Sequence, residues 1–166
     1  MVANEIAQLI REKAARNENC VLGMATGNTP VKLYKELVRM HREEGLSFKN
    51  VITFNLDEYY PIEKSAYQIY WSFMHRNLFN HIDIDPANIH IPDGTWPKES
   101  IKKHCAEYEQ KLIDLGGVDL QLLGIGLNGH IGFNEPGSGQ FSKTRLVNLD
   151  KDRKSTRLNS SHANIS

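Results

Sequence analysis

Three apolar runs, each followed by turn residues, constrain the fold of this chain most. They lie at 19–27, 50–60 and 118–126, with helix-like patterns between them. Strands that alternate with helices predict an α/β fold, an open parallel sheet with helices on both faces. The carboxyl ends of parallel strands lie at one edge of the sheet, where such folds bind their ligands. The turns after the three runs are therefore expected to converge.

Four helices are expected around these strands, each with apolar residues three and four positions apart. They cover residues 5–16, 29–45, 65–82 and 97–117. In the second helix, Thr29 is expected as the N-cap, Pro30 in the first helical position and Gly45 at the end. Gly116 and Gly117 are expected to stop the fourth helix.

Composition excludes several classes of partner. Lys plus Arg and Asp plus Glu number 20 each, so no global field recruits nucleic acid or an anionic membrane. The apolar runs are too short to span a bilayer, and the charged start is not a secretory signal. Cys20 and Cys105 lie far apart, which predicts reduced thiols in a cytoplasmic protein. Cys105 is at helical spacing from Ile101 and Tyr108, so it is expected in the core.

The first turn, "GMATGNTP", leads from a strand into a helix. Its free backbone N–H groups and the helix dipole suit a phosphate, and Thr26 and Thr29 can add hydroxyl donors. The alternative is a plain strand–helix turn with a good cap. It is not a Walker A loop, because the Gly-Lys-Ser/Thr ending is missing.

The second turn, "FNLDEYY", places two carboxylates where a strand should end. Adjacent residues of an extended chain point to opposite sides, so at most one of Asp57 and Glu58 faces a given pocket. A carboxylate over C2 of a sugar could act as a general base. The alternative is a solvated pair of loop residues.

The third turn, "GIGLNGHIGFNEPGS", contains five glycines, a proline, His130 and Glu135. Gly124, Gly126 and Gly129 form G-x-G-x-x-G, but the glycines and proline that follow forbid the helix of a dinucleotide site. Histidine moves protons near pH 7, and a carboxylate on its second nitrogen fixes the tautomer. Metal binding is disfavoured, since short His/Cys spacings are absent. A loop histidine capped by a neighbour remains the alternative.

Four stretches resemble the glucosamine-6-phosphate deaminase family. They are "LGMATGNTP", "VITFNLDEYY", "YWSFMHRNLFNHIDI" and "LLGIGLNGHIGFNEPGS", and the similarity runs from about Gly23 to Asp150. The resemblance implies a Rossmann-like sheet without a nucleotide, and conversion of D-glucosamine 6-phosphate into D-fructose 6-phosphate and ammonia. It implies no cofactor, and a small sugar phosphate as the partner.

The resemblance also implies roles for individual residues. Asp57 matches the general base that takes the C2 proton and returns it at C1. His130 matches the residue that shuttles a proton during ring opening, and Glu135 matches its partner. Asn128 stands where many members have aspartate, which removes a charge beside His130. The loop that holds the sugar phosphate is matched by Thr26, Gly27, Asn28 and Thr29.

Some family features have no counterpart here. Members continue with further strands and with an Arg and a Lys on the phosphate. Because the first helix also has no strand before it, this chain is expected to be truncated at both ends, and it is expected to be homo-oligomeric when full length. An allosteric phosphate site of some members is matched in part by Ser138 and Arg145, whereas Val147 replaces a lysine.

The end of the chain differs in composition from the rest. Residues 1–150 are expected to form a partial isomerase/deaminase domain. Residues 151–166 are rich in Ser and Asn without apolar periodicity, and we expect a disordered or non-native tail with no strand or helix. Two further functions stay open: a 6-phosphogluconolactonase-like hydrolase and a non-catalytic sugar-phosphate sensor.

Overall fold

The computed structural model describes most of the chain, namely residues 2–62, 70–125, 131–134, 138–139, 141–148 and the backbone of 163–165. The α-helices are α1 (Val2–Ala15), α2 (Val31–Glu44), α3 (Tyr70–Asn77) and α4 (Ile101–Asp114). The strands are β1 (Cys20–Met24), β2 (Val51–Asn55), β3 (Glu58–Tyr60), β4 (Ile89–His90), β5 (Leu120–Gln121), β6 (Leu146–Val147) and β7 (Ala163–Ile165). Short 3-10 turns lie at Phe79–His81, Pro86–Asn88 and Lys98–Ser100.

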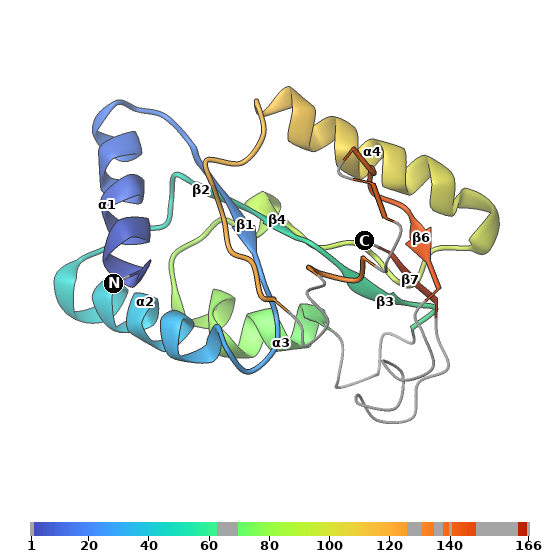
Figure 1. The fold of residues 1–166 in the computed structure, drawn as a ribbon. Helices are drawn as coiled ribbons and strands as arrows, with labels where there is room; N and C mark the ends of the chain where they lie inside the picture. Colours follow the sequence, from blue (N-terminus) through green and yellow to red (C-terminus); the bar gives the residue numbers. More distant parts are fainter. Residues whose placement is uncertain are drawn as a thin grey trace.

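A parallel sheet of four strands in the order β4-β2-β1-β5 forms the centre of the molecule (Figure 1). The register of β1 and β2 runs from Cys20 opposite Val51 to Met24 opposite Asn55. Every residue of β1 and β2 is buried, as expected for parallel strands that are covered on both faces. The predicted parallel sheet is confirmed.

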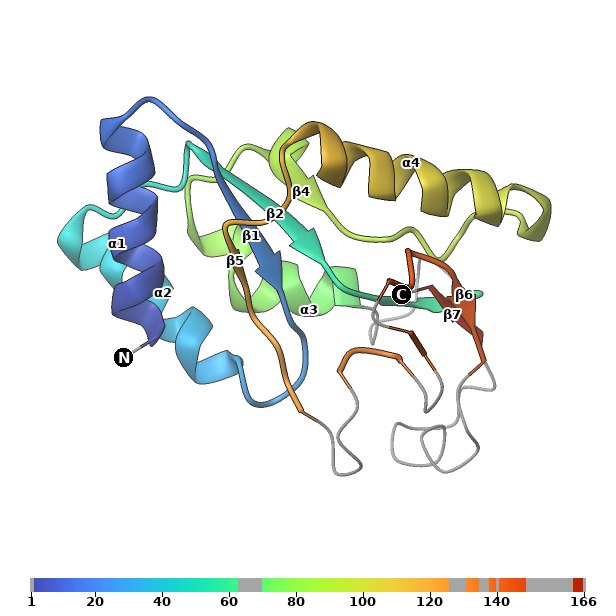
Figure 2. The ribbon, with the colours of Figure 1, turned by 45° about the horizontal axis from the view of Figure 1, so that its top comes forward.

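Helices cover both faces of this sheet, which confirms the predicted fold class. Helices α1, α2 and α3 lie on one face and α4 lies on the other (Figure 1 and Figure 2). Alternate residues of β1 face opposite layers: Leu22 packs in the α1–α2–α3 layer, whereas Val21 packs with Tyr108 and Leu112 of α4.

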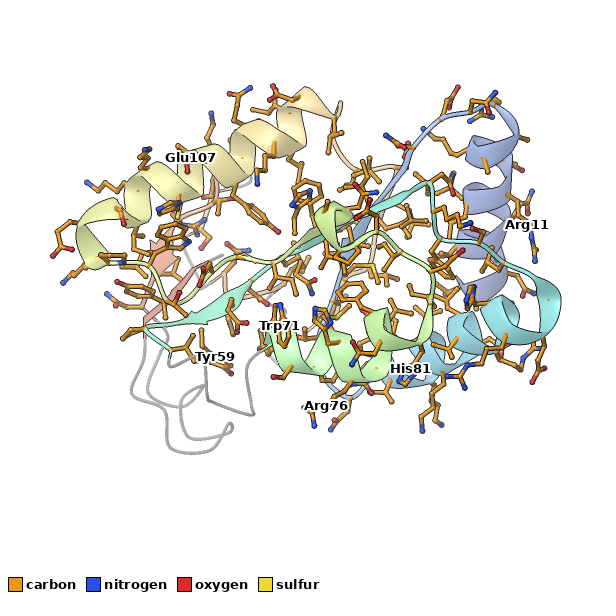
Figure 3. All side chains as sticks on the ribbon, turned by 180° about the vertical axis from the view of Figure 1, so that it is seen from behind. Arg11, Tyr59, Trp71, Arg76, His81 and Glu107 are labelled. Carbon is orange, nitrogen blue, oxygen red and sulfur yellow. The ribbon has the colours of Figure 1, made fainter. Side chains whose placement is uncertain are left out.

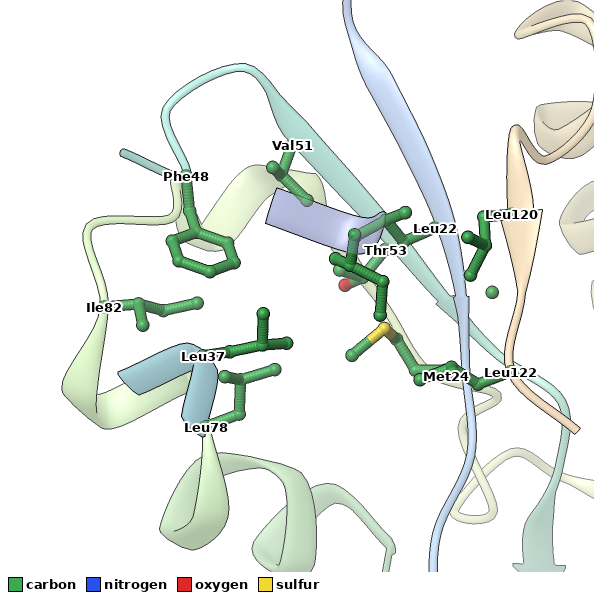
Figure 4. Close-up of a pocket in the computed structure, with 12 residues that line it drawn as sticks. Leu22, Met24, Leu37, Phe48, Val51, Thr53, Leu78, Ile82, Leu120 and Leu122 are labelled. Atoms are coloured by element: carbon green, nitrogen blue, oxygen red, sulfur yellow. The ribbon is translucent and has the colours of Figure 1, made fainter. Parts of the chain in front are cut away.

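The layer between the sheet and α1, α2 and α3 is almost fully packed. A cavity of about 10 Å³ remains, with Leu22, Leu37 and Phe48 among its walls (Figure 4). That volume holds about one water molecule, so a sugar phosphate does not fit in this layer.

Glycines end two helices where the sequence predicts. Gly45 follows α2 with φ of 68°, and its N–H donates to the carbonyl of Met40. Gly116 and Gly117 follow α4 with φ of 80° and 89°. The predicted start of α2 is wrong by one residue: Pro30 is the N-cap, because its carbonyl accepts the first helical hydrogen bond, from the N–H of Tyr34 at 2.9 Å.

Helix α3 ends at Asn77, earlier than the predicted end at residue 82. A 3-10 turn at Phe79–His81 follows it, and residues 63–69 lie outside the described part. Cys105 is buried against Tyr60 and Ile101, as predicted for a core thiol. Among the described residues, no helix has the length and apolar character needed to cross a lipid bilayer.

A second sheet, in the order β3-β7-β6, was not expected from the sequence. Strand β7 pairs antiparallel with both β3 and β6. The expectation of no strand after residue 150 is therefore wrong for Ala163–Ile165, because pairing with distant strands, rather than local periodicity, forms β7. Residues 151–162 and 166 lie outside the described part, and the domain boundary at 150 stays a prediction.

Candidate active site

The carboxyl ends of β2, β1 and β5 lie side by side because these strands are neighbours. The chain runs from β1 to β2 on one side of β1 and returns with β5 on its other side. Such a reversal of strand order opens the crevice in which doubly wound sheets bind ligands. The residues that leave this edge are 25–30, 56–57 and 122–125.

The turn after β1 combines an unusual backbone with an open helix start. Gly27 has φ of 101°, a conformation that favours glycine. Helix α2 starts after Pro30 without a side-chain cap and without an acidic residue in its first turn. The first N–H groups of α2 carry partial positive charge. Because the first turn of α2 has no acidic residue, no carboxylate in that turn neutralises this charge. The predicted phosphate loop, Thr26 to Thr29, contains Gly27 and ends directly before Pro30.

Tyr34 of α2 holds the beginning of this loop. Its buried hydroxyl donates to the carbonyl of Ala25 and accepts the N–H of the same residue at 3.3 Å. Burial raises the pKa of the Tyr34 hydroxyl far above its ordinary value, so the hydroxyl keeps its proton. The loop and the helix it precedes are thus joined by a side chain as well as by the backbone.

Asp57 lies at the corner between β2 and β3, and only 8% of it is exposed. Its Oδ2 atom lies 3.3 Å from the point at which a Cβ atom on Gly132 would stand. Gly132 comes two residues after His130, so the corner after β2 meets the segment that follows β5. Burial raises the pKa of the nearby Tyr108 hydroxyl, and the charge of Asp57 raises it further.

Glu58 faces away from Asp57, as the alternation of an extended chain predicts. Its carboxylate accepts the N–H groups of Tyr70 and Trp71 at the start of α3. Only Asp57 is therefore placed for chemistry beside Gly132.

Aromatic packing holds the segment 131–134 against this corner. The Phe133 ring lies 5.2 Å from Tyr59 of β3 and 5.8 Å from Tyr70 of α3, measured between centroids. Phe133 and Tyr70 are both buried. Such ring pairs stabilise a contact beyond the area they bury. The segment directly after His130 is therefore fixed to the two elements that flank Asp57.

The other predicted acid–base residues, Asn128, His130 and Glu135, lie outside the described residues. The described residues on either side of 126–130 pair with each other, because Ile125 forms an antiparallel bridge with Ile131. The roles of the three residues stay predictions.

Arg145 joins residues on the two sides of 135–137. Its Nη2 atom donates to Oδ1 of Asn134 and to Oγ of Ser138, each at 3.0 Å. Val147, the other position noted in the sequence, packs against the Tyr70–Phe133 cluster, so an apolar side chain suits that place.

Comparison with known proteins identifies the family of this chain. The family described as "Glucosamine-6-phosphate isomerases/6-phosphogluconolactonase" matches residues 1–159. The chain belongs to this family.

Curated relatives within the isomerase/lactonase family carry deaminase names. A glucosamine-6-phosphate deaminase of Clostridium botulinum (strain Langeland) is 46% identical over 150 residues, which cover 90% of this chain and 61% of that protein. A glucosamine-6-phosphate deaminase-like protein of Bacteroides thetaiotaomicron is 51% identical over 149 residues, which cover 90% of this chain and 22% of that protein. The chain thus spans about three fifths of the Clostridium relative's length.

Solved structures of the family share the fold. A structure described as a monomeric glucosamine-6-phosphate deaminase matches with a TM-score of 0.91 and 38% identity, covering 99% of this chain and 68% of that one. A 6-phosphogluconolactonase from Thermotoga maritima matches with a TM-score of 0.72 and 22% identity, covering 99% and 72%. The latter similarity shows the fold alone.

Three residues of this candidate site were not predicted from the sequence. Tyr34 fits the apolar stripe of a helix, which hides its hydrogen bonds to Ala25. Glu58 was considered only as a rival of Asp57, because its partners on α3 are 12 and 13 residues away. The positive φ of Gly132, 59°, is hidden among the many glycines of its segment.

Proposed function

We propose that this chain carries the acid–base residues of a glucosamine-6-phosphate deaminase. The reaction converts D-glucosamine 6-phosphate and water into D-fructose 6-phosphate and ammonia. The observation that carries the proposal is the buried Asp57 at the sheet edge, beside the segment that follows His130. Curated relatives with deaminase names support this activity over the lactonase activity.

The phosphate end of the substrate is assigned to the turn after β1. The N–H groups at the start of α2, which has no side-chain cap, and the hydroxyls of Thr26 and Thr29 suit a phosphate. β1 and β2 are paired along their length, with Met24 opposite Asn55. A sugar whose phosphate lies on the turn after β1 therefore extends along the edge toward Asp57.

The proposed chemistry at Asp57 is a proton transfer between neighbouring carbons. A closed sugar has no acidic C2 hydrogen, so the ring opens first, with His130 and Glu135 proposed as the groups that move the proton. The open aldehyde at C1 then acidifies C2, and the Asp57 carboxylate takes that proton to leave an enolamine and returns it to C1. Water adds to the resulting C2 imine, ammonia leaves, and the ketose forms. General acid–base steps of this kind contribute roughly 10²- to 10⁴-fold each.

Two further features belong to the same proposal. Cys20 and Cys105 are free thiols, which suits a protein of the reducing cytosol. The full-length protein is proposed to be a homo-oligomer, whereas one similar deaminase structure is described as monomeric. Analytical ultracentrifugation of a full-length form would decide between these states, and a single monomeric species would refute the oligomer.

Release of ammonia tests the proposed activity directly. Because the relatives are longer, the test protein should have their length: residues 1–150 followed by the part of the Clostridium relative beyond the match. In this extended protein Asp57, His130 and Glu135 all come from the present chain. We expect ammonia and D-fructose 6-phosphate in equal amounts from D-glucosamine 6-phosphate.

Two other outcomes would replace the proposal. Hydrolysis of 6-phosphogluconolactone without ammonia release from the amino sugar would make the protein a lactonase. Binding of sugar phosphates without turnover of either compound would make it a sensor.

A further inference from the structure

Glu58 is buried, with 2% of its surface exposed, and its carboxylate joins two elements of the site. Oε1 accepts the N–H of Tyr59 at 2.9 Å and that of Tyr70 at 3.1 Å, and Oε2 accepts the N–H of Trp71 at 3.1 Å. Figure 3 shows Tyr59 on β3 beside Trp71 at the start of α3. A strand and a helix that begin 12 residues apart are thus held by one side chain.

Physical chemistry explains the strength of this contact. The first N–H groups of a helix have no partner within the helix, and the helix dipole places partial positive charge on them. A carboxylate that accepts such N–H groups forms hydrogen bonds about twice as strong as neutral ones.

We infer that Glu58 is a positioning residue for the proposed deaminase reaction, because it holds β3 to the first turn of α3 and so fixes Asp57 beside Gly132. With Glu58 held on the α3 side, the alternation of the chain directs Asp57 to the opposite side. There its Oδ2 approaches the Gly132 backbone. Tyr59 and Tyr70, whose N–H groups bind Glu58, also carry the rings that pack on Phe133.

The burial of Glu58 and the charges around it predict how the protonation of Glu58 depends on pH. Burial raises the pKa of Glu58 to about 7, the three N–H donors oppose this shift, and the charge of Asp93 adds to it. Glu58, His75 and Asp93 line one cleft of about 570 Å³, and Asp57 is not among its lining residues. The segment of Asp93 packs on β3, since a Cβ on Gly94 would lie 2.1 Å from the carbonyl oxygen of Tyr59.

The test compares Glu58→Gln with Asp93→Asn in the extended protein. Glutamine keeps one acceptor oxygen for Tyr59 and Tyr70 but places an NH₂ group against the N–H of Trp71. This inference rests on the proposed function, and we expect a kcat for deamination roughly 10- to 100-fold lower with a nearly unchanged KM. Asp93→Asn should keep the native kcat at pH 8.

The pH profile separates positioning from a merely structural role. Native kcat should fall as the pH drops through about 7, because Glu58 then gains a proton and loses its charge. Glu58→Gln should lack this limb, and Asp93→Asn should shift it to lower pH, because a like charge has been removed. If Glu58→Gln only reduced the amount of folded protein, its kcat would still fall as the pH drops through about 7. An unchanged limb in Glu58→Gln would overturn the inference.

Amide hydrogen exchange of the 166-residue chain tests the contact without any activity. Glu58→Gln should speed exchange at Trp71 roughly tenfold, the effect of losing one hydrogen bond to a charged group, and should speed exchange across 131–134. Asp93→Asn should change neither. If no ammonia is released by the native protein, the proposed function fails. The exchange pattern alone then decides whether Glu58 fixes the corner between β2 and β3 that carries Asp57. Unchanged exchange across 131–134 would then refute it.

Discussion

At the end of β2 the chain buries a carboxylate, Asp57, next to Gly132, a glycine with a left-handed backbone. A base that moves a proton between C2 and C1 has to reach both carbons from one position, which requires a fixed side chain more than a mobile one. The corner supplies that fixation through Glu58 on one side and the Tyr59–Tyr70–Phe133 cluster on the other.

Asp57→Asn removes the proposed proton acceptor and preserves the shape of the side chain. We expect kcat for ammonia release by the extended protein to fall about 10²- to 10⁴-fold, with KM nearly unchanged, because the phosphate contacts remain. Steady-state kinetics with D-glucosamine 6-phosphate measure both constants. A kcat within about tenfold of the native value would show that another group moves the C2 proton.

Gly132→Ala and Gly45→Ala form a matched pair. Both residues have positive φ, 59° and 68°, so each alanine should lower the free energy of unfolding by about 1 kcal/mol. The new Cβ on residue 132 would lie 3.3 Å from Oδ2 of Asp57, whereas that on residue 45 would meet nothing within 4 Å. Urea unfolding should therefore show similar losses of stability, but only Gly132→Ala should lower kcat. Equal kcat values for the two variants would show that the segment around Gly132 does not affect Asp57.

Among the elements, α2 connects the core to the predicted phosphate loop. Its buried residues Tyr34, Leu37 and Val38 lie on the face that packs against the sheet, and its open first turn lies at the carboxyl edge. The Tyr34 hydroxyl bonds to both backbone groups of Ala25, so the loop keeps its direction relative to the helix.

Tyr34→Phe tests this connection. The ring stays in the core, and the N–H and carbonyl of Ala25 lose their partner, so the free energy of unfolding should fall by ~1–2 kcal/mol. The KM for D-glucosamine 6-phosphate should rise while kcat changes little, because the proposed function assigns phosphate binding to the loop and the proton transfer to Asp57. A kcat loss with an unchanged KM would assign the loop to the chemical step instead.

Elements with strong local patterns were predictable, and those formed by distant pairing were not. β1 and β2 are fully buried strands of mostly apolar residues, and Gly45 ends α2 as its position suggests. β4 has only two residues, and β7 lies in a Ser- and Asn-rich segment. Both strands form because they pair with β2 and β3, respectively, and not because of their own sequence pattern. For the same reason Asp57 could be proposed from the sequence, whereas the contacts of Glu58 with α3 could not.

For the whole molecule, Glu58 links stability to pH. Burial raises its pKa from the ordinary 4.5 to about 7, so between these values the folded chain keeps a proton that the unfolded chain has lost. The contribution of Glu58 is complete below pH 4.5 and is lost as the pH rises through about 7. Relative to Glu58→Gln, the native chain should lose up to ~3 kcal/mol across this window, measured by urea unfolding. A constant difference between the two proteins would contradict the raised pKa.

The whole account depends on three turns that meet at one edge of the sheet, and a crystal structure with a bound analogue tests this most directly. The analogue is an open-chain glucosamine 6-phosphate whose carbonyl has been reduced, so that it binds without reacting. In the extended protein, we predict its phosphate on the N–H groups of the turn after β1 and its C2 within about 3.5 Å of the Asp57 carboxylate. An analogue bound with its phosphate away from that turn, or with Asp57 directed away from C2, would contradict the account.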